Sequence, residues 1–222
     1  MQEFRIMEID KIVNLLRNNT DQYMQPLIDI IIEEYGKDPF LVLIGCLLSL
    51  RVKDSTTIHV CRELFNRART PEQLLLISRP ELEKIVFKTG FFRNKAYIVH
   101  DVSKIIHERF QNKVPDTYEE LISIRGVGPK TANLVLGMAF GKPAICVDTH
   151  VHRISNRLGL ISTKTPEETE DALKKLLPKK YWISWNKYLV IWGQNICAPI
   201  SPKCSSCVLN KLCKRVGVTK SR

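Results

Sequence analysis

One lysine, one aspartate and four cysteines have the residue types and spacing that could do chemistry. The lysine is Lys130, which follows Pro129 directly after a Gly-x-Gly turn. Proline suits the first position of a helix, so Lys130 is expected in the first turn of a helix. The helix dipole disfavours a positive charge there, which favours the neutral, nucleophilic amine. Taken by itself, Lys130 would more readily be interpreted as a lysine that contacts phosphate or solvent, one of many in this sequence.

The aspartate is Asp148, in the segment Val147-Asp148-Thr149-His150. A helical pattern follows it, and Asp is a favoured residue at the N-cap, so capping alone would explain this side chain. A carboxylate brought beside Lys130 could also assist deprotonation of the amine and stabilise positive charge on a sugar as a base departs. The two roles are compatible.

The cysteines follow the pattern Cys197-x6-Cys204-x2-Cys207-x5-Cys213, and three others lie singly in apolar patterns typical of a core. Four thiols crowded together in an intracellular protein indicate a metal site rather than disulfides. Tetrahedral zinc and an iron–sulfur cluster both use four cysteines. Zinc sites usually combine two short Cys-x2–4-Cys pairs, and only one such pair occurs here. The spacing therefore favours the iron–sulfur cluster.

The segment 118–140 predicts a helix, a tight turn Arg125-Gly126-Val127-Gly128, and a second helix. Two glycines in four residues allow unusual backbone angles and a close approach of the chain to a ligand. Backbone amides at the start of the second helix form an anion site suited to a DNA phosphate. We therefore predict that Gly126, Val127 and Gly128 bind DNA through the backbone, although such a turn can also be a purely structural connection.

The elements that must position these residues are helices. Apolar residues recur at helical spacing, as in Ile98, Val102, Ile105 and Ile106, and strand-type alternation is hard to find. Thr-Pro-Glu sequences at residues 70 and 165 indicate helix starts, as do Asp38-Pro39 and Asp116-Thr117. The sequence predicts an all-α fold of about a dozen helices.

The net charge and the lengths of the apolar runs indicate which kinds of partner this protein binds. Lys and Arg number 34 against 23 acidic residues, a formal charge of +11 with a pI near 9.4, which favours a polyanion such as nucleic acid. A generally basic surface would have the same charge. We expect no membrane span, because no apolar run approaches the roughly 20 residues that a span requires. The first residues lack the apolar core of a secretory signal, so we expect a cytoplasmic, nucleoid-associated protein.

The hairpin Leu121-x-x-Ile124-Arg125-Gly126-Val127-Gly128-Pro129-Lys130, the Asp148 segment and the cysteine spacing together resemble the endonuclease III family, the iron–sulfur members of the helix-hairpin-helix DNA glycosylases. The resemblance runs through nearly the whole chain. It implies two α-helical lobes: a six-helix barrel with the hairpin, at residues 32–142, and a cluster lobe made of residues 1–31 and 143–222. It also implies that the four cysteines hold a [4Fe-4S] cluster.

The activity implied by the resemblance is removal of oxidised or ring-saturated pyrimidines from double-stranded DNA, with cleavage at abasic sites. Lys130 would attack C1′ of a flipped-out nucleotide, expel the base and form a Schiff base that permits β-elimination of the 3′ phosphate. Asp148 would assist the lysine and the developing sugar cation. Flipping is required because a stacked nucleotide hides the reacting carbon. We expect a monomer whose partner is duplex DNA containing damaged bases or abasic sites.

Two further loops of this family fill the gap that the flipped nucleotide leaves. They correspond to Ser49–Asp54 and Thr89–Asn94, with Arg51 and Phe91 as the inserting residues. Gln and Leu are the residues most associated with these positions, so the opposite-base preference is expected to differ.

In the loop between the first two cluster cysteines, Lys203 is the single basic residue where relatives often carry several, and we expect a small contribution to DNA binding. Pro129 replaces a basic residue of the hairpin, which suits its helical position.

Two other functions compete with this one. A monofunctional mismatch glycosylase of the same superfamily would usually lack the hairpin lysine, and the adenine-specific type carries an additional C-terminal domain. A non-catalytic helix-hairpin-helix DNA-binding protein with a structural metal would require Lys130 and Asp148 to be coincidences.

Overall fold

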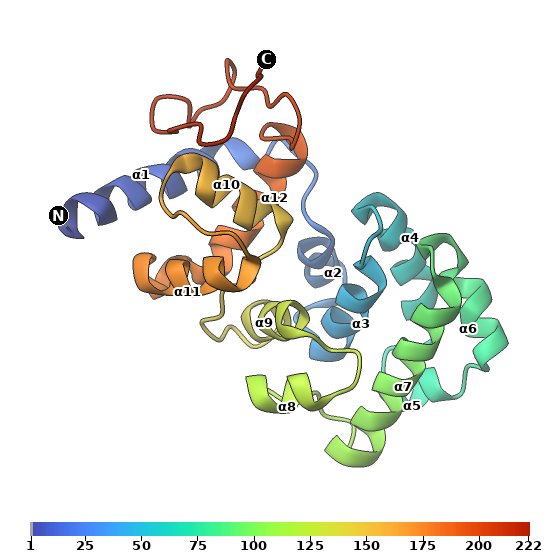
Figure 1. Cartoon of the computed structure of the whole chain (residues 1–222). Helices are drawn as coiled ribbons and strands as arrows, with labels where there is room; N and C mark the ends of the chain where they lie inside the picture. Colours follow the sequence, from blue (N-terminus) through green and yellow to red (C-terminus); the bar gives the residue numbers. More distant parts are fainter. Residues whose placement is uncertain (1) are drawn as a thin grey trace. The chain divides into compact units, whose positions relative to one another are not determined.

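The computed structural model describes residues 2–222, with side chains from residue 7 onward (Figure 1). The described chain forms twelve α-helices and two short 3-10 helices, with no strand, which confirms the all-α prediction. The helices are α1 (Gln2–Thr20), α2 (Leu27–Tyr35), α3 (Pro39–Ser49), α4 (Asp54–Phe65), α5 (Pro71–Leu75), α6 (Arg79–Val86), η1 (Phe87–Thr89), α7 (Phe92–Phe110), α8 (Tyr118–Ser123), α9 (Pro129–Met138), α10 (Thr149–Leu158), α11 (Pro166–Leu176), η2 (Lys179–Tyr181) and α12 (Trp182–Asn195).

The helices belong to two compact units. The middle unit is residues 26–142, and the terminal unit combines the N-terminal residues through Gln25 with residues 143–222. The middle unit therefore begins before residue 32, the boundary expected from sequence. The physical reason lies in α2, whose Ile28 and Ile31 are buried and whose first amide, Leu27 N, donates to Asp54 Oδ2 at the start of α4 (3.2 Å).

The centre of the middle unit is α3. Every residue from Phe40 to Leu48 is buried, as expected for a helix that is apolar on all sides. Asp38 caps it by accepting from the backbone amides of Phe40 and Leu41 at 2.9 Å. Helices α2, α4, α7 and α9 all pack against α3, so α9 is positioned by the central helix of its unit.

The terminal unit is built around α12, where Trp185 and Trp192 are buried. Helices α1 and α10 pack against α12, and α11 packs against α10. Beyond Asn195 the described chain has no further helix. This C-terminal segment is held by backbone hydrogen bonds such as Ser205 N to Arg222 O (3.0 Å) and Val216 N to Arg157 O (3.1 Å).

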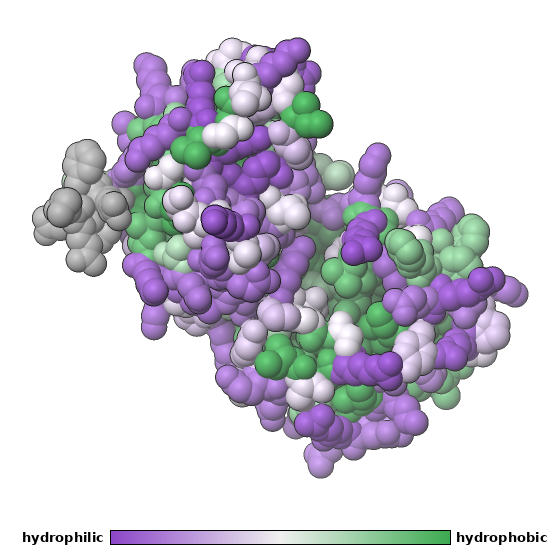
Figure 2. Space-filling view, in the orientation of Figure 1, coloured by the Kyte–Doolittle hydropathy of each residue, from purple (hydrophilic) through white to green (hydrophobic). Residues whose placement is uncertain are grey.

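Polar residues cover most of the face shown in Figure 2. Among the described residues, no helix combines the length and apolar character needed to cross a membrane. A few large apolar side chains are nevertheless exposed, and two of them, Leu50 and Phe91, lie in the loops that the sequence predicts to enter DNA.

Candidate functional site

The predicted helix-hairpin-helix is present at α8 and α9 (Figure 1). Thr117 caps α8 by accepting from Glu120 N (3.4 Å). The turn closes through Val127 N, which donates to Ile124 O at 3.0 Å, and both of these side chains are buried. The turn is thus anchored by its apolar residues and presents its backbone outward.

The two glycine positions of the turn differ in whether they could accommodate a side chain. Gly126 has φ 95°, and a Cβ there would lie 2.8 Å from Ile98 Cγ2 on α7. Gly128 has φ −95°, ordinary for any residue, and a Cβ there would meet nothing within 4 Å. Gly126 is therefore needed to form the turn. Gly128 is the N-cap of α9 without a side-chain cap, so an external anion has access to the helix start.

Lys130 lies in the first turn of α9 and is exposed. The positive charge of Lys130 acts on the buried thiol of Cys46 in α3. Burial raises the pKa of Cys46 to about 12, and the positive charge of Lys130 opposes that rise. The Cys46 thiol is therefore neutral at physiological pH.

Asp148 is the N-cap of α10, as predicted. Its Oδ1 accepts from the amides of His150 (2.9 Å) and Val151 (2.8 Å). The segment before it is held by Asn186, whose side chain donates to Cys146 O (3.0 Å). Backbone and packing therefore orient this carboxylate. Asp148 belongs to the terminal unit, whereas Lys130 belongs to the middle unit.

The four C-terminal cysteines line a single cavity of the terminal unit. Three of their sulfurs accept hydrogen bonds: Cys197 from Arg157 (3.3 Å), Cys207 from the Trp192 indole (3.3 Å) and Cys213 from the Arg215 amide (3.4 Å). Burial raises the pKa of the Cys207 and Cys213 thiols. Such thiols stay protonated unless a cation compensates the thiolate charge.

Cys197, Cys204, Cys207 and Cys213 are the residues that would hold the metal group expected from the sequence, because all four line this cavity. Within the described part of the chain, no three His, Cys, Asp or Glu side chains are arranged as a metal site.

Arg157 and Arg153 are site residues that the sequence analysis missed. Arg157, only 9% exposed, donates to the carbonyls of Ala198 and Pro199, both at 2.7 Å. Arg153 donates to Cys197 O at 2.9 Å. These arginines of α10 hold the loop that follows the first cysteine. The helical spacing of four residues places them on one face, but the sequence does not reveal which carbonyls they meet.

Lys203 is exposed on that same loop and lines the cysteine cavity, with its backbone amide donating to Ile196 O (3.0 Å). The structure therefore places this predicted DNA-binding residue beside the cysteines, on the surface of the terminal unit.

Arg51 and Phe91 lie far apart in sequence but line the same cavity of about 310 Å³ in the middle unit. Residues 49–52 form a turn closed by Val52 N to Ser49 O (3.1 Å), with φ −56° and ψ 117° at Leu50 and φ 60° at Arg51. These are type II values, and that third position usually holds Gly or Asn. Phe91 is also left-handed, at φ 47° and ψ 29°, and is 72% exposed. Both predicted inserting residues thus have uncommon backbone conformations, which often cluster at ligand clamps.

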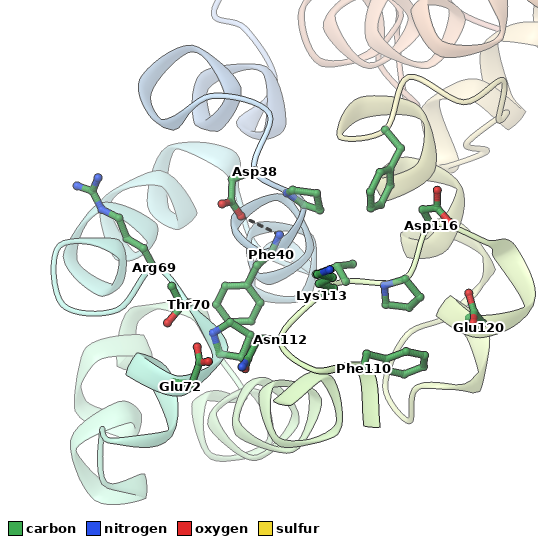
Figure 3. Close-up of a pocket in the computed structure, with 15 residues that line it drawn as sticks. Asp38, Phe40, Arg69, Thr70, Glu72, Phe110, Asn112, Lys113, Asp116 and Glu120 are labelled. Atoms are coloured by element: carbon green, nitrogen blue, oxygen red, sulfur yellow. Dashed lines mark hydrogen bonds between the residues drawn. The ribbon is translucent and has the colours of Figure 1, made fainter. Parts of the chain in front are cut away.

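A separate hollow of about 630 Å³ in the middle unit contains none of the predicted site residues. Figure 3 shows Phe40, Glu72 and Asn112 on one side of it and Asp116 and Glu120 on the other. Its carboxylates are accompanied by basic side chains, as in the Lys142–Asp116 ion pair (2.7 Å). The hollow therefore has no charge of one sign that would select an ionic ligand.

Comparison with known proteins defines the class. Residues 44–179 match the family model described as the HhH-GPD superfamily base excision DNA repair protein, which covers more than half of the chain. A structure of a thermostable thymine-DNA glycosylase, 24% identical with a TM-score of 0.80, shares the fold. The chain belongs to the HhH-GPD superfamily of base-excision DNA repair proteins.

Within that superfamily, the chain is a member of the endonuclease III family. It is 47% identical to endonuclease III of Thermotoga maritima over 177 residues, which are 80% of this chain and 83% of the relative. Endonuclease III of Bacillus subtilis is 38% identical over 80% of this chain and 81% of its own length. A solved non-covalent endonuclease III–DNA complex is 34% identical with a TM-score of 0.76, covering 85% of this chain and 92% of that one. A trapped endonuclease III–DNA covalent intermediate is 33% identical with a TM-score of 0.75, covering 91% and 96%.

Proposed function

We propose that this protein is a base-excision DNA glycosylase with abasic-site lyase activity, which removes oxidised or ring-saturated pyrimidines from double-stranded DNA. The observation that carries the proposal is the position of Lys130, an exposed amine in the first turn of the hairpin helix α9. A hairpin that only binds phosphate does not need a nucleophile there. The structure of a trapped covalent endonuclease III–DNA intermediate supports covalent chemistry in a relative.

The reaction is a substitution followed by an elimination. The Lys130 amine attacks C1′ of the flipped nucleotide, the C1′–N bond breaks, and the base leaves with the electron pair and acquires a proton. The sugar ring then opens to a Schiff base between Lys130 and C1′. Loss of the C2′ proton expels the 3′ phosphate by β-elimination, and water releases the lysine. Asp148 accepts the proton of the attacking amine and stabilises the positive charge on the sugar.

The hairpin and the two inserting loops bind the DNA. Backbone amides of Gly126, Val127 and Gly128 contact a phosphate, and Lys203 adds a small electrostatic contribution. Arg51 and Phe91 occupy the space that the extruded nucleotide leaves, which compensates lost stacking. The substrate is double-stranded DNA containing damaged bases or abasic sites, and we place the activity in the cytoplasm, in association with the nucleoid.

Cys197, Cys204, Cys207 and Cys213 hold a [4Fe-4S] cluster whose contribution is structural. The cluster ties together the C-terminal segment, which has no helix beyond Asn195 in the described chain. Arg157, Trp192 and the Arg215 amide donate to three of the ligand sulfurs, which compensates thiolate charge.

The function is tested with duplex DNA containing one oxidised pyrimidine. We expect strand cleavage without alkali, because the lyase step follows base removal on the same enzyme. Cleavage only after alkali would identify a monofunctional glycosylase. Binding without base release on several lesions would identify a DNA-binding protein without this activity.

The two hairpin glycines are expected to respond differently to alanine. Gly126→Ala should lower the free energy of unfolding by about 1–3 kcal/mol, because it combines a strained φ with a clash. Gly128→Ala should change stability by less than about 0.5 kcal/mol, yet weaken binding to undamaged duplex DNA by about tenfold, because the added methyl separates the backbone from the phosphate. Thermal unfolding and fluorescence anisotropy measure the two effects. Equal DNA affinity of Gly128→Ala and the wild type would contradict phosphate binding at this turn.

The cluster proposal predicts about four irons per chain in protein purified without oxygen. Cys213→Ala should lose most of this iron and unfold at lower temperature, because the C-terminal segment depends on the cluster. Cys61→Ala is the matched control, since its thiol is buried in the middle unit. Metal analysis and visible absorption decide the outcome. Stoichiometric zinc without iron in the wild type contradicts the proposal.

A further inference from the structure

Lys95 is a buried lysine that the proposed reaction does not use. It lies on α7 and is 6% exposed. Its Nζ donates to two backbone carbonyls, Leu48 O at 2.7 Å and Thr89 O at 2.9 Å. Leu48 is in the last turn of α3, and Thr89 is the last residue of η1. Carbonyls at such positions lack an amide partner within their own helix. The amino group of Lys95 therefore supplies the missing hydrogen bond to one carbonyl at the end of each helix.

The two helix ends that Lys95 joins are those from which the inserting loops begin. The turn containing Arg51 follows Leu48 directly, and Gly90 and Phe91 follow Thr89. Left-handed conformations of bulky residues cost on the order of 1–3 kcal/mol each and persist only where the surroundings enforce them. Thr89 is itself buried, and its hydroxyl donates to Val86 O (2.7 Å). Thr89 is thus held through its side chain by Val86 and through its carbonyl by Lys95.

Burying the ammonium group of Lys95 between the two helix ends costs free energy. Burial lowers the pKa of Lys95 to about 8, which reflects the cost of keeping the charge away from water. An apolar side chain of similar length would fill the volume without that cost, but it could not donate to two carbonyls. Lys95 also lines the 310 Å³ cavity together with Arg51 and Phe91. Without its hydrogen bonds, the loops could close over this cavity or separate.

We propose that Lys95 is a positioning residue: its amino group joins the ends of α3 and η1 and thereby sets the spacing and conformation of Arg51 and Phe91 for insertion into DNA. This inference rests on the proposed function, because it concerns how the same protein opens its substrate. Lys95 does not contact the reacting atoms. It acts on the step in which the nucleotide leaves the stack.

The test compares two substrates that differ in the cost of extrusion. One contains an oxidised pyrimidine in fully paired duplex DNA, and the other has the same lesion in an unpaired bulge, where little stacking is lost on flipping. The variant is Lys95→Met, which keeps the length of the stem and removes the donors. Its control is Lys104→Met, an exposed lysine on the same helix. Single-turnover base release is measured at a temperature at which all variants are folded.

We expect Lys95→Met to slow base release from the paired duplex by at least tenfold and from the bulge by less than threefold, with Lys104→Met unchanged on both. In the Phe91→Ala background, Lys95→Met should have little further effect, because both changes disable the same insertion step. Equal slowing on both substrates, or full additivity with Phe91→Ala, overturns the inference. If Lys95→Met does not fold, Lys95→Leu, which also removes the donors, is judged by the same ratio at a lower temperature. Failure of the wild type on both substrates would instead refute the proposed function.

Discussion

Lys130→Ala should abolish the covalent complex that borohydride traps between this protein and duplex DNA containing an oxidised pyrimidine. The wild type forms a Schiff base with C1′, and borohydride reduces it to a stable amine. Alanine has no nucleophile, so base release by this route should fall by at least about a thousandfold. The fold should not change, because Lys130 is exposed and alanine is a good helix former. Trapping is measured by gel shift under denaturing conditions.

Lys130→Arg is the matched control for charge. It keeps a cation at the start of α9 but forms no Schiff base, so it should bind DNA nearly as well as the wild type and trap nothing. Trapping that persists in Lys130→Ala would assign the nucleophile to another amine. Base release by the wild type without trapping would exclude the lysine mechanism and leave a water-mediated glycosylase.

Asp148→Asn should reduce base release by about a hundredfold or more while leaving the protein folded. Asn caps a helix about as well as Asp, so the hydrogen bonds to His150 N and Val151 N are retained and stability should change by less than about 1 kcal/mol. Only the negative charge is removed, and this charge is what stabilises the sugar cation as the base leaves. Single-turnover kinetics and thermal unfolding give the two quantities.

Asp148→Ala separates the two roles of this residue. It removes both the charge and the cap, so it should lose as much activity as Asp148→Asn and an additional 0.5–2 kcal/mol or so of stability. Cleavage of a pre-formed abasic site should suffer less in both variants, because no base has to depart. Wild-type activity in Asp148→Asn would show that the residue is only a helix cap.

The position of Asp148 also depends on how α10 packs against α12 at Gly193. A Cβ at Gly193 of α12 would lie 2.1 Å from His150 Nδ1 on α10, the helix that Asp148 caps. The backbone of α12 approaches α10 this closely only because Gly193 has no side chain. The orientation of the Asp148 carboxylate therefore depends on packing as well as on its local cap.

The local features of this protein were determined by its sequence. Helix starts at Asp38, Thr70, Thr117, Asp148 and Thr165 were predicted from residue types, and each of these side chains accepts a backbone amide in the structure. The hairpin was likewise predicted from its own residues. Caps and tight turns depend on neighbours within a few residues, so the sequence contains all the information needed to form them. The order of the three motifs was also enough to indicate the family.

Only the tertiary structure decided the features that depend on distant neighbours. It assigned α2 to the middle unit, placed Arg157 against the loop after Cys197, and brought Arg51 and Phe91 to one cavity. Lys95 is the clearest case, because in sequence it is one lysine among many, and only its burial against Leu48 and Thr89 distinguishes it. The physical reason is that a side chain's burial and its hydrogen-bond partners depend on which helices pack together. Local spacing does not specify that packing.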